Sequence, residues 1–512
     1  MATTTRKTYY KELDFSKGMS YDSLIVNTPD GYANVIRNWD PKPEGGLRPR
    51  EEWTFGSQTG TTSQVYGANS MYWDPVGENV YVFRQANSTT SAVVAKVAEG
   101  YSWSTLDSLT MTETINYPVP FASGNNVIVY GSSYFPNSRL RAYTGSGSPV
   151  DAETTGLAGL AIAHHKNRFW SGGRTASTLS SRLYYTGLGA YSDWNSSNYI
   201  EIAPEDGSRI VDAAVFADGL VIAKRNGLYY LSGDDFYTFR VNRLEGGMGT
   251  WGRCIQPTPY GCVIAGAHRV YLWTGGAVQD ITGGVNTDYV HNDPQGVSTS
   301  YLDKRLYLAS NSKIYVRDME TGAWWIHTSS GTSGNEVYDQ IRVITKSGYE
   351  TEYAIFGMPA AWFPTSPSLK GLWYKKYDTN SFSYSPKRDE GSLPPQNFLI
   401  HTGYMPLGDG ISPVTLKHIY LVYRELPNTG SWAGETGLEV TVTDGNNTDR
   451  TKTLTVPIKN KGYATAYRER LDVGMDGLWS IHLHIHHEPE DDEYTTIEIN
   501  KVVLEYAMEN PR

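Results

Sequence analysis

The chain of 512 residues is poor in cysteine, in charged residues and in long apolar runs. Its two cysteines, Cys254 and Cys262, are eight residues apart, which matches neither a C-x-x-C redox motif nor the paired motifs of zinc sites. We therefore expect two buried free thiols that act as small hydrophobic side chains, with a disulfide as the less favoured alternative.

Charged residues make up only 19% of the chain, the formal net charge is −10, and no run of Lys and Arg occurs. A surface that grips nucleic acid needs clustered basic side chains to neutralise phosphates. The sequence therefore argues against a protein whose main surface embraces nucleic acid.

No stretch approaches the roughly 18 to 20 apolar residues that a membrane-spanning helix needs. The opening MATTTRKTYYKELDF has no apolar segment ahead of a cleavage site. We expect no membrane insertion, and synthesis and retention in the cytoplasm.

The abundant residues are those of an all-β protein: 51 Gly, 25 Pro and 38 Tyr, with Asn, Ser and Thr between short apolar runs. The length exceeds one ordinary compact core, which predicts two domains or one large repeat architecture.

A pair of short strands recurs through the middle of the chain. A polar or glycine turn followed by an alternating apolar strand, as in KRLYLA, is found seven times, usually with a second strand such as SKIYVRD after it. Steps of 42 to 51 residues separate the copies, close to the spacing of propeller blades. The anchors are Val80, Val127, Phe169, Leu220, Cys262, Leu306 and Tyr353. Aromatic residues that follow a second strand are expected to cap a blade against its neighbour: Trp103, Trp194, Phe236, Trp324, Trp325 and Phe382.

Seven such units predict a seven-bladed β-propeller over residues 66–386. A four-stranded sheet buries both faces only between neighbouring blades, so the ring must close. The extended N-terminal segment, residues 1–65, is expected to contribute the closing strand, with TYYKELDF (residues 8–15) as a candidate.

A charged, proline-rich hinge at residues 385–396 ends the repeat. Longer strands with alternating apolar and polar residues follow, separated by Gly, Asn and Pro turns. They predict a C-terminal β-sandwich of the jelly-roll or lectin-like kind over residues 391–512.

One strand of this sandwich, SIHLHIHH, places His482, His484 and His486 on the same face, about 6.6 Å apart from one to the next. Two imidazoles and a carboxylate from the following EPEDDE turn would suit zinc. Natural sites usually gather ligands from more than one strand, so we favour a solvent-facing or subunit-facing strand and predict no metal site. The EPEDDE run lacks the alternating D-x-D-x-D-G order of acidic residues in a calcium-binding loop, and it is expected to be a solvated turn.

Motifs for catalysis are missing. The sequence contains no G-x-S-x-G, H-E-x-x-H or Walker loop, and neither the S-x-D-x-G-x-x-W turns nor the paired carboxylates of propeller glycosidases. We predict no catalytic residue, no cofactor-binding residue and no enzyme activity. The many Tyr and Trp side chains favour protein interfaces instead.

Three segments carry a family resemblance. DFSKGMSYDSLIVNTPDGYANVIRNWDPKPEGGLRPREEWTF (residues 14–55) resembles the start of the tail nozzle, or tail hub, proteins of short-tailed bacteriophages. In that family, a turn like FSKGM precedes an asparagine-centred strand like VIRNWD and a GGLRPR-type turn into the propeller. Residues 244–285 and IYVRDMETGAWW (residues 314–325) are similar to the family's later hairpins, so the resemblance spans roughly residues 12–385.

The resemblance implies a virion structural protein that forms a homo-oligomeric ring, usually a hexamer. Such a ring extends the tail below the portal and the head-to-tail adaptor, conducts DNA during ejection without binding it specifically, and docks tail fibre proteins. It implies a location in the virion tail after assembly in the host cytoplasm, and no catalytic residues. An acidic chain suits a channel that must not grip a duplex with one negative charge per roughly 1.7 Å of axis.

Two alternatives stay open. One is a carbohydrate-binding or carbohydrate-degrading tail-tip protein in which exposed Trp and Tyr stack on sugars and the C-terminal sandwich acts as a lectin. The other is a minor tail protein of a long-tailed phage that uses the same propeller.

Overall fold

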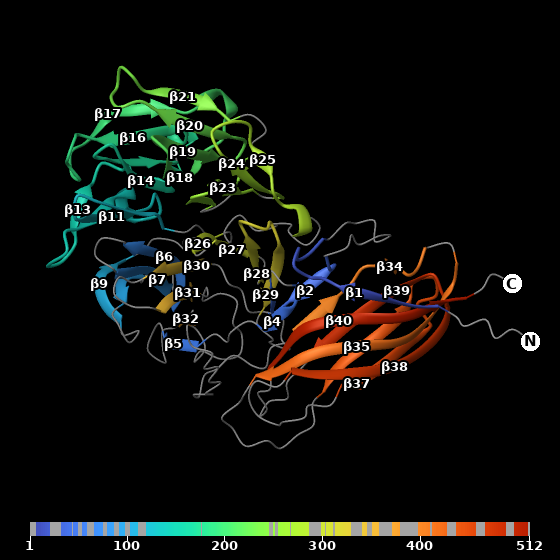
Figure 1. The fold of residues 1–512 in the computed structure, drawn as a ribbon. Coiled ribbons are helices and arrows are strands. Elements are labelled where there is room, and N and C mark those ends of the chain that lie inside the picture. The colour runs from blue at the N-terminus through green and yellow to red at the C-terminus, as the bar shows by residue number, and fades with distance from the viewer. Residues whose placement is uncertain are drawn as a thin grey trace, which may run out of the picture.

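The computed structural model shows an all-β protein in which a propeller and a sandwich lie side by side (Figure 1). The structure describes residues 7–20, 32–42, 45–49, 54–58, 66–74, 79–86, 92–97, 103–110, 119–175, 177–244, 249–250, 254–266, 268–285, 298–302, 304–310, 313–328, 340–345, 351–357, 371–378, 398–409, 412–426, 437–456, 466–487 and 496–509. Helix in these ranges is limited to short 3₁₀ turns at Pro136–Ser138, Ser177–Leu179, Pro204–Asp206 and Gly283–Val285. None of the helices described is long and apolar enough to cross a bilayer.

Seven units of four antiparallel strands, here called blades 1 to 7, form the propeller; six are separate sheets, and blade 6 is part of a larger sheet. Blade 1 has β6 (Tyr66–Asp74), β7 (Asn79–Ala86), β8 (Ala92–Val97) and β9 (Trp103–Leu109); blade 2 has β10 (Phe121–Gly124), β11 (Val127–Gly131), β12 (Leu140–Tyr143) and β13 (Val150–Glu153). Blade 3 has β14 (Ala161–His165), β15 (Arg168–Gly172), β16 (Arg182–Thr186) and β17 (Trp194–Glu201); blade 4 has β18 (Ile210–Phe216), β19 (Gly219–Lys224), β20 (Leu228–Ser232) and β21 (Arg240–Arg243). Blade 5 has β22 (Ile255–Thr258), β23 (Gly261–Ala265), β24 (Val270–Trp273) and β25 (Gln279–Asp280); blade 6 has β26 (Ser298–Leu302), β27 (Arg305–Ser310), β28 (Lys313–Asp318) and β29 (Trp324–Thr328). Blade 7 has β30 (Gln340–Thr345), β31 (Thr351–Gly357), β32 (Gly371–Asp378) and β5 (Thr54–Gln58).

The predicted repeat is confirmed blade by blade. Each of the seven anchor residues lies in the second strand of a blade, and each predicted partner strand is the third. The first strands contact one another in the order β6, β10, β14, β18, β22, β26, β30 and back to β6. The blades therefore close into a seven-membered ring.

The strand that completes blade 7 comes from the N-terminal segment. β5 pairs antiparallel with β32 and forms the outer edge of that blade. The candidate TYYKELDF is wrong: β1 (Thr8–Leu13) pairs instead with β40 (Thr496–Met508) of the sandwich. There Tyr9 stacks on Tyr506, with ring centroids 5.7 Å apart, and Leu13 is buried. An alternating strand of this kind fits any half-covered sheet, so its pattern alone does not identify its partner.

Two sheets make the sandwich, and both ends of the chain contribute to it. One sheet has the order β3 (Trp39–Pro41), β4 (Leu47–Pro49), β40, β35 (Val414–Leu426) and β38 (Ala466–Leu478), with β1 beside β40. The other contains β33 (Phe398–His401), β39 (Ser480–His487), β36 (Leu438–Asp444) and β37 (Thr451–Val456), with β34 (Met405–Pro406) beside β39. Because β1, β3 and β4 precede the propeller, the propeller is inserted into the sandwich. The sequence prediction, which ended the N-terminal segment at residue 65 and began the sandwich at residue 391, did not include this insertion.

A short N-terminal strand, β2 (Val35–Arg37), joins the two parts. It lies parallel to β29 of blade 6 through Arg37 and Ile326, and antiparallel to β33 of the sandwich. Blade 6 and the second sandwich sheet thereby form one continuous ten-stranded sheet.

Buried polar side chains tie neighbouring blades together. The Lys224 side chain on β19 is completely buried, and its Nζ donates to the carbonyls of Ile202 and Ala203 at 2.7 and 2.8 Å and to Asp206 Oδ1 at 2.6 Å. These partners follow blade 3, so the lysine fastens blade 4 to the link that precedes it.

Asp212 plays a similar part between blades 4 and 5. Its Oδ2 accepts hydrogen bonds from the backbone N–H groups of Cys254 and Ile255 at 2.9 and 3.0 Å. A buried backbone donor without a partner is costly, so these bonds favour one way of docking the blades.

Acid should weaken the bond between Lys224 and Asp206. Burial raises the pKa of Asp206, but hydrogen bonds from Lys224 and Ser208 outweigh it and leave the pKa below its ordinary value of 3.8. The stabilisation is complete above that value and is lost as the pH falls through the lowered pKa of the folded state. Asp206→Asn should cost about 3 kcal/mol near neutral pH, because it leaves a buried ammonium unpaired, and should lessen the loss of stability in acid.

Thermal unfolding midpoints from about pH 7 down to pH 2 measure both effects. Asp449→Asn, at an exposed position of the sandwich, is the matched control and should behave as the wild type. An Asp206→Asn variant with the acid dependence of the wild type would contradict the assignment.

Candidate functional site

The described residues form no recognisable catalytic constellation. In these ranges, no group of three or more His, Cys, Asp and Glu side chains is arranged to hold a metal ion. Cys254 and Cys262 are buried and free, as predicted. Burial raises the pKa of both thiols, so neither is a reactive thiolate.

Phe236 does not cap its blade, contrary to the sequence prediction. It lies in the turn between β20 and β21, where Phe236 is 65% and Tyr237 85% exposed. Phe239 takes the capping place, with its ring 5.4 Å from Trp170 and 5.7 Å from Tyr185. The spacing after a strand did not distinguish two aromatic residues three positions apart.

Hydrogen bonds hold this turn rigidly. Asp235 Oδ1 accepts from the backbone N–H groups of Tyr237 and Thr238 at 3.0 and 3.1 Å, and Thr238 Oγ1 accepts from the N–H of Asp234 at 3.0 Å. Phe236 and Tyr237 are therefore presented to solvent on a fixed turn, here called the aromatic tip. Ordered, exposed aromatic side chains are typical of binding surfaces.

The other predicted caps have different outcomes. Trp324 and Trp325 are buried in blade 6, and Trp194 packs against the apolar cluster of blades 2 and 3. The side chain of Trp103 and all of Phe382 lie outside the described residues.

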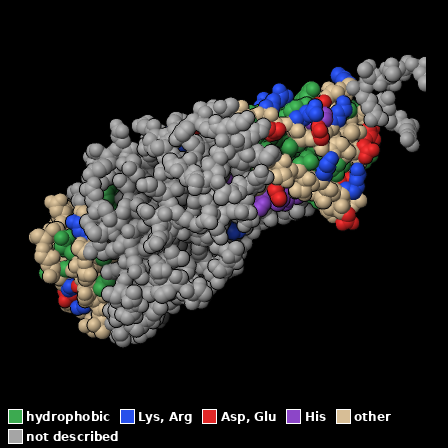
Figure 2. Space-filling view, turned by 90° about the horizontal axis from the view of Figure 1, so that it is seen from below, with side chains coloured by type: hydrophobic (Ala, Val, Ile, Leu, Met, Phe, Trp, Pro, Cys, Tyr) green, Lys and Arg blue, Asp and Glu red, His purple; other side chains and the backbone are tan. Residues whose placement is uncertain are grey.

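The histidine face of β39 is as the alternation predicted. Ile481, Leu483 and Ile485 are buried in the sandwich, while the three histidines between and after them lie on the opposite face. Figure 2 shows histidine side chains side by side on the surface of the sandwich.

The structure adds a fourth histidine, His401, which sequence reasoning missed. It lies on β33 directly opposite His484, with ring centroids 3.9 Å from His482 and 5.6 Å from His484. Burial and, to a lesser extent, the neighbouring His482 and His484 together lower the pKa of His401 to about 4. Burial likewise lowers the pKa values of His482 and His484, so all three are neutral near pH 7. The only sequence signal was the alternation of the short strand FLIH.

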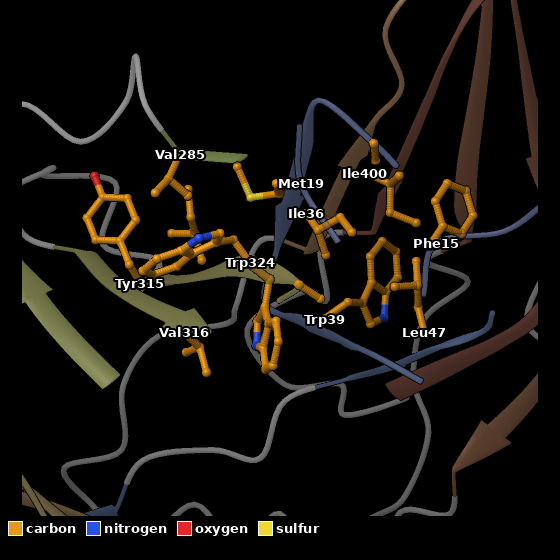
Figure 3. Packing of buried hydrophobic residues seen from close by; sticks show 14 of the residues in the cluster. Phe15, Met19, Ile36, Trp39, Leu47, Val285, Tyr315, Val316, Trp324 and Ile400 are labelled. Atoms are coloured by element: carbon orange, nitrogen blue, oxygen red, sulfur yellow. The ribbon is translucent and has the colours of Figure 1, made fainter. Parts of the chain in front are cut away.

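The family-like segments FSKGM and METGAWW meet at the junction between the propeller and the sandwich (Figure 3). Gly18 and Trp324 form a parallel β-bridge, and Met19 N–H donates to Trp324 O at 2.8 Å. Gly18 has a φ of +75°, and a Cβ there would lie 2.5 Å from Trp324 O. Only glycine fits this turn without displacing blade 6.

The VIRNWD segment binds the same junction from the other side. Asp40 is buried, with Oδ1 2.7 Å from His327 Nε2 and Oδ2 3.1 Å from Arg305 Nη1, both in blade 6. The neighbouring Trp39 donates from Nε1 to Ile497 O in the sandwich at 3.2 Å, and its ring packs on Phe398. Consecutive residues of one segment therefore hold both parts of the molecule.

Gly18→Ala should weaken this junction. The left-handed conformation alone costs an alanine about 1 kcal/mol, and the contact with Trp324 should bring the total to about 3 kcal/mol. Gly145→Ala is the matched control, since Gly145 has a φ of +92° and no atom within 4 Å of its would-be Cβ. Denaturant midpoints of the two variants measure the difference, and equal losses would contradict the docking of the turn on blade 6.

Comparison with known proteins finds distant structural likeness only. No protein-family model matches the chain, and no curated protein matches it as a relative. Similar solved structures include the Neurospora crassa Pan2 WD40 domain (TM-score 0.41, 9% identity, 65% of this chain and 97% of that one) and Saccharomyces cerevisiae Sqt1 (TM-score 0.40, 9% identity, 73% and 100%). A third is the AfRom2 CNH domain (TM-score 0.38, 10% identity, 64% and 99%). At such low identity and TM-scores, nothing about the functions of these proteins applies to this chain.

Proposed function

We propose that this protein is a structural component of a bacteriophage tail. In this proposal it forms a nozzle or hub ring that extends the tail channel, conducts DNA during ejection and docks neighbouring tail proteins or fibres. It acts without catalysis, as a homo-oligomer next to the head-to-tail adaptor, in a virion tail assembled in the host cytoplasm.

The observation that carries the proposal is the convergence of the family-like segments. FSKGM (residues 15–19) and VIRNWD (residues 35–40) lie near the N-terminus, far in sequence from METGAWW (residues 319–325). FSKGM reaches blade 6 through the bridge between Gly18 and Trp324, and VIRNWD reaches it through Asp40, which contacts Arg305 and His327. All three segments therefore contribute to one buried junction between the propeller and the sandwich, and this shared structural role supports the resemblance.

The continuous sheet between blade 6 and the sandwich supports a mechanical role. Strand β2 hydrogen-bonds to both blade 6 and the sandwich, so a force on one part is transmitted to the other through a sheet. A ring subunit that lines a channel on the inside and holds fibres on the outside benefits from such a connection.

A carbohydrate-binding tail-tip protein is the second candidate, and the aromatic tip is the observation that favours it. Phe236 and Tyr237 are exposed on a rigid turn, and aromatic rings of this kind stack on the apolar faces of sugars.

Purified full-length protein should assemble into closed rings. Native mass spectrometry should give a mass that is a multiple of the single chain, and negative-stain micrographs should show rings with a central hole. A chain that stays monomeric at micromolar concentration and is absent from phage particles would refute the proposal.

A glycan array with the full chain separates the two candidates. The whole chain is needed because β1, β3 and β4 of the sandwich precede the propeller. Glycan binding that is lost in the Phe236→Ser, Tyr237→Ser double variant would favour the tail-tip protein; no binding together with ring formation would favour the nozzle.

A further inference from the structure

We propose that His401, His482 and His484 form a three-histidine site for a divalent transition metal ion such as Zn²⁺, on the outer face of the sandwich. The inference concerns the sandwich alone and does not depend on the proposed ring.

The site draws on two strands. His482 and His484 are alternate residues of β39, and His401 lies on the neighbouring antiparallel strand β33, in register with His484. The sequence argued against a metal because only one strand carried histidines; the structure supplies the second. Two alternate residues of one strand and a third across the ladder place three imidazoles around one point above a sheet.

The spacing of the rings is close to what a metal requires. A Zn–N distance of about 2.1 Å with angles near tetrahedral places the centres of two ligating imidazoles about 5 Å apart. The observed separations of 3.9 Å for His401 and His482 and 5.6 Å for His401 and His484 lie on either side of that value. Among the described residues, no three such side chains already stand in the geometry that holds a metal ion. Binding therefore requires the imidazole rings to turn and shift by about 1 Å, which is within ordinary side-chain freedom.

One of the three histidines has a ligating nitrogen that is free to bind. His482 Nε2 is buried and has no hydrogen-bond partner among the described residues. A buried polar atom without a partner is costly, and a metal–nitrogen bond would remove that cost. The intermediate exposure of the three rings leaves an access route from solvent.

The surroundings suit an open site. His486 stacks on His484 with ring centroids 5.9 Å apart, and Glu439 on β36 lies opposite His486 in the ladder. The carboxylate of Glu439 adds favourable negative charge beside a cation. Three protein ligands leave a fourth position for water or for a side chain of another protein.

Metal titration of the full chain tests the site. The protein, without a histidine tag and treated with a chelator, is titrated with Zn²⁺ by calorimetry and with Co²⁺ by visible absorption. We expect one equivalent per chain and the absorption of nitrogen-ligated cobalt in a four- or five-coordinate geometry. His401→Gln and His484→Gln should each weaken binding at least tenfold.

His418→Gln is the matched control, because His418 lies on the other sheet, where Nδ1 is 2.8 Å from Asp472. This variant should bind as the wild type does, and metal-free unfolding midpoints should confirm that all variants are folded. No saturable binding, several weak equivalents per chain, or equal losses in the His418 and His401 variants would overturn the proposal.

Discussion

The pairing of three N-terminal strands with four distant strands is the constraint on which the rest of the structure depends. β1 lies against β40, β2 lies between β29 and β33, and β5 lies against β32. The first pairing adds a strand to the sandwich, the second joins sandwich to propeller, and the third completes blade 7. Because each blade needs two neighbours to bury its faces, a loss at blade 7 affects the whole ring.

Local polar and aromatic contacts determine how the blades dock, once closure brings them together. Lys224, Asp212 and the Asp107–Arg141 pair each satisfy buried donors across or beside a blade interface. Such contacts contribute little net free energy but penalise any other docking, since a misplaced partner would leave a buried charge unpaired. Apolar packing gives the ring its stability, and these groups give it one register.

The blades could be predicted from the sequence because the residues that specify each hairpin lie close together in the chain. A turn, an alternating strand and a second strand within about twenty residues specify a hairpin, and seven of them at one spacing specify a propeller. The alternation of SIHLHIHH likewise showed which face the histidines share. Long-range pairing has no such signal: nothing local in TYYKELDF indicates β40 as its partner, and nothing near His401 indicates His484.

β38 was not predicted as a strand because charged residues occupy its outward positions, leaving a weak apolar pattern around Leu471 and Val473. The place of Phe236 was misread because Phe239, three residues later, makes the packing contact.

Splitting the sandwich between the two ends of the polypeptide has a consequence for biosynthesis. Because translation runs from the N-terminus to the C-terminus, β40 is made long after β1, so this pair can form only after the propeller between them has been synthesised. β5 finds its partner β32 earlier, once all seven hairpins have emerged. Translation therefore orders assembly, with the ring completed first and the sandwich last, and a prematurely terminated product lacks the strand against which its own beginning should fold.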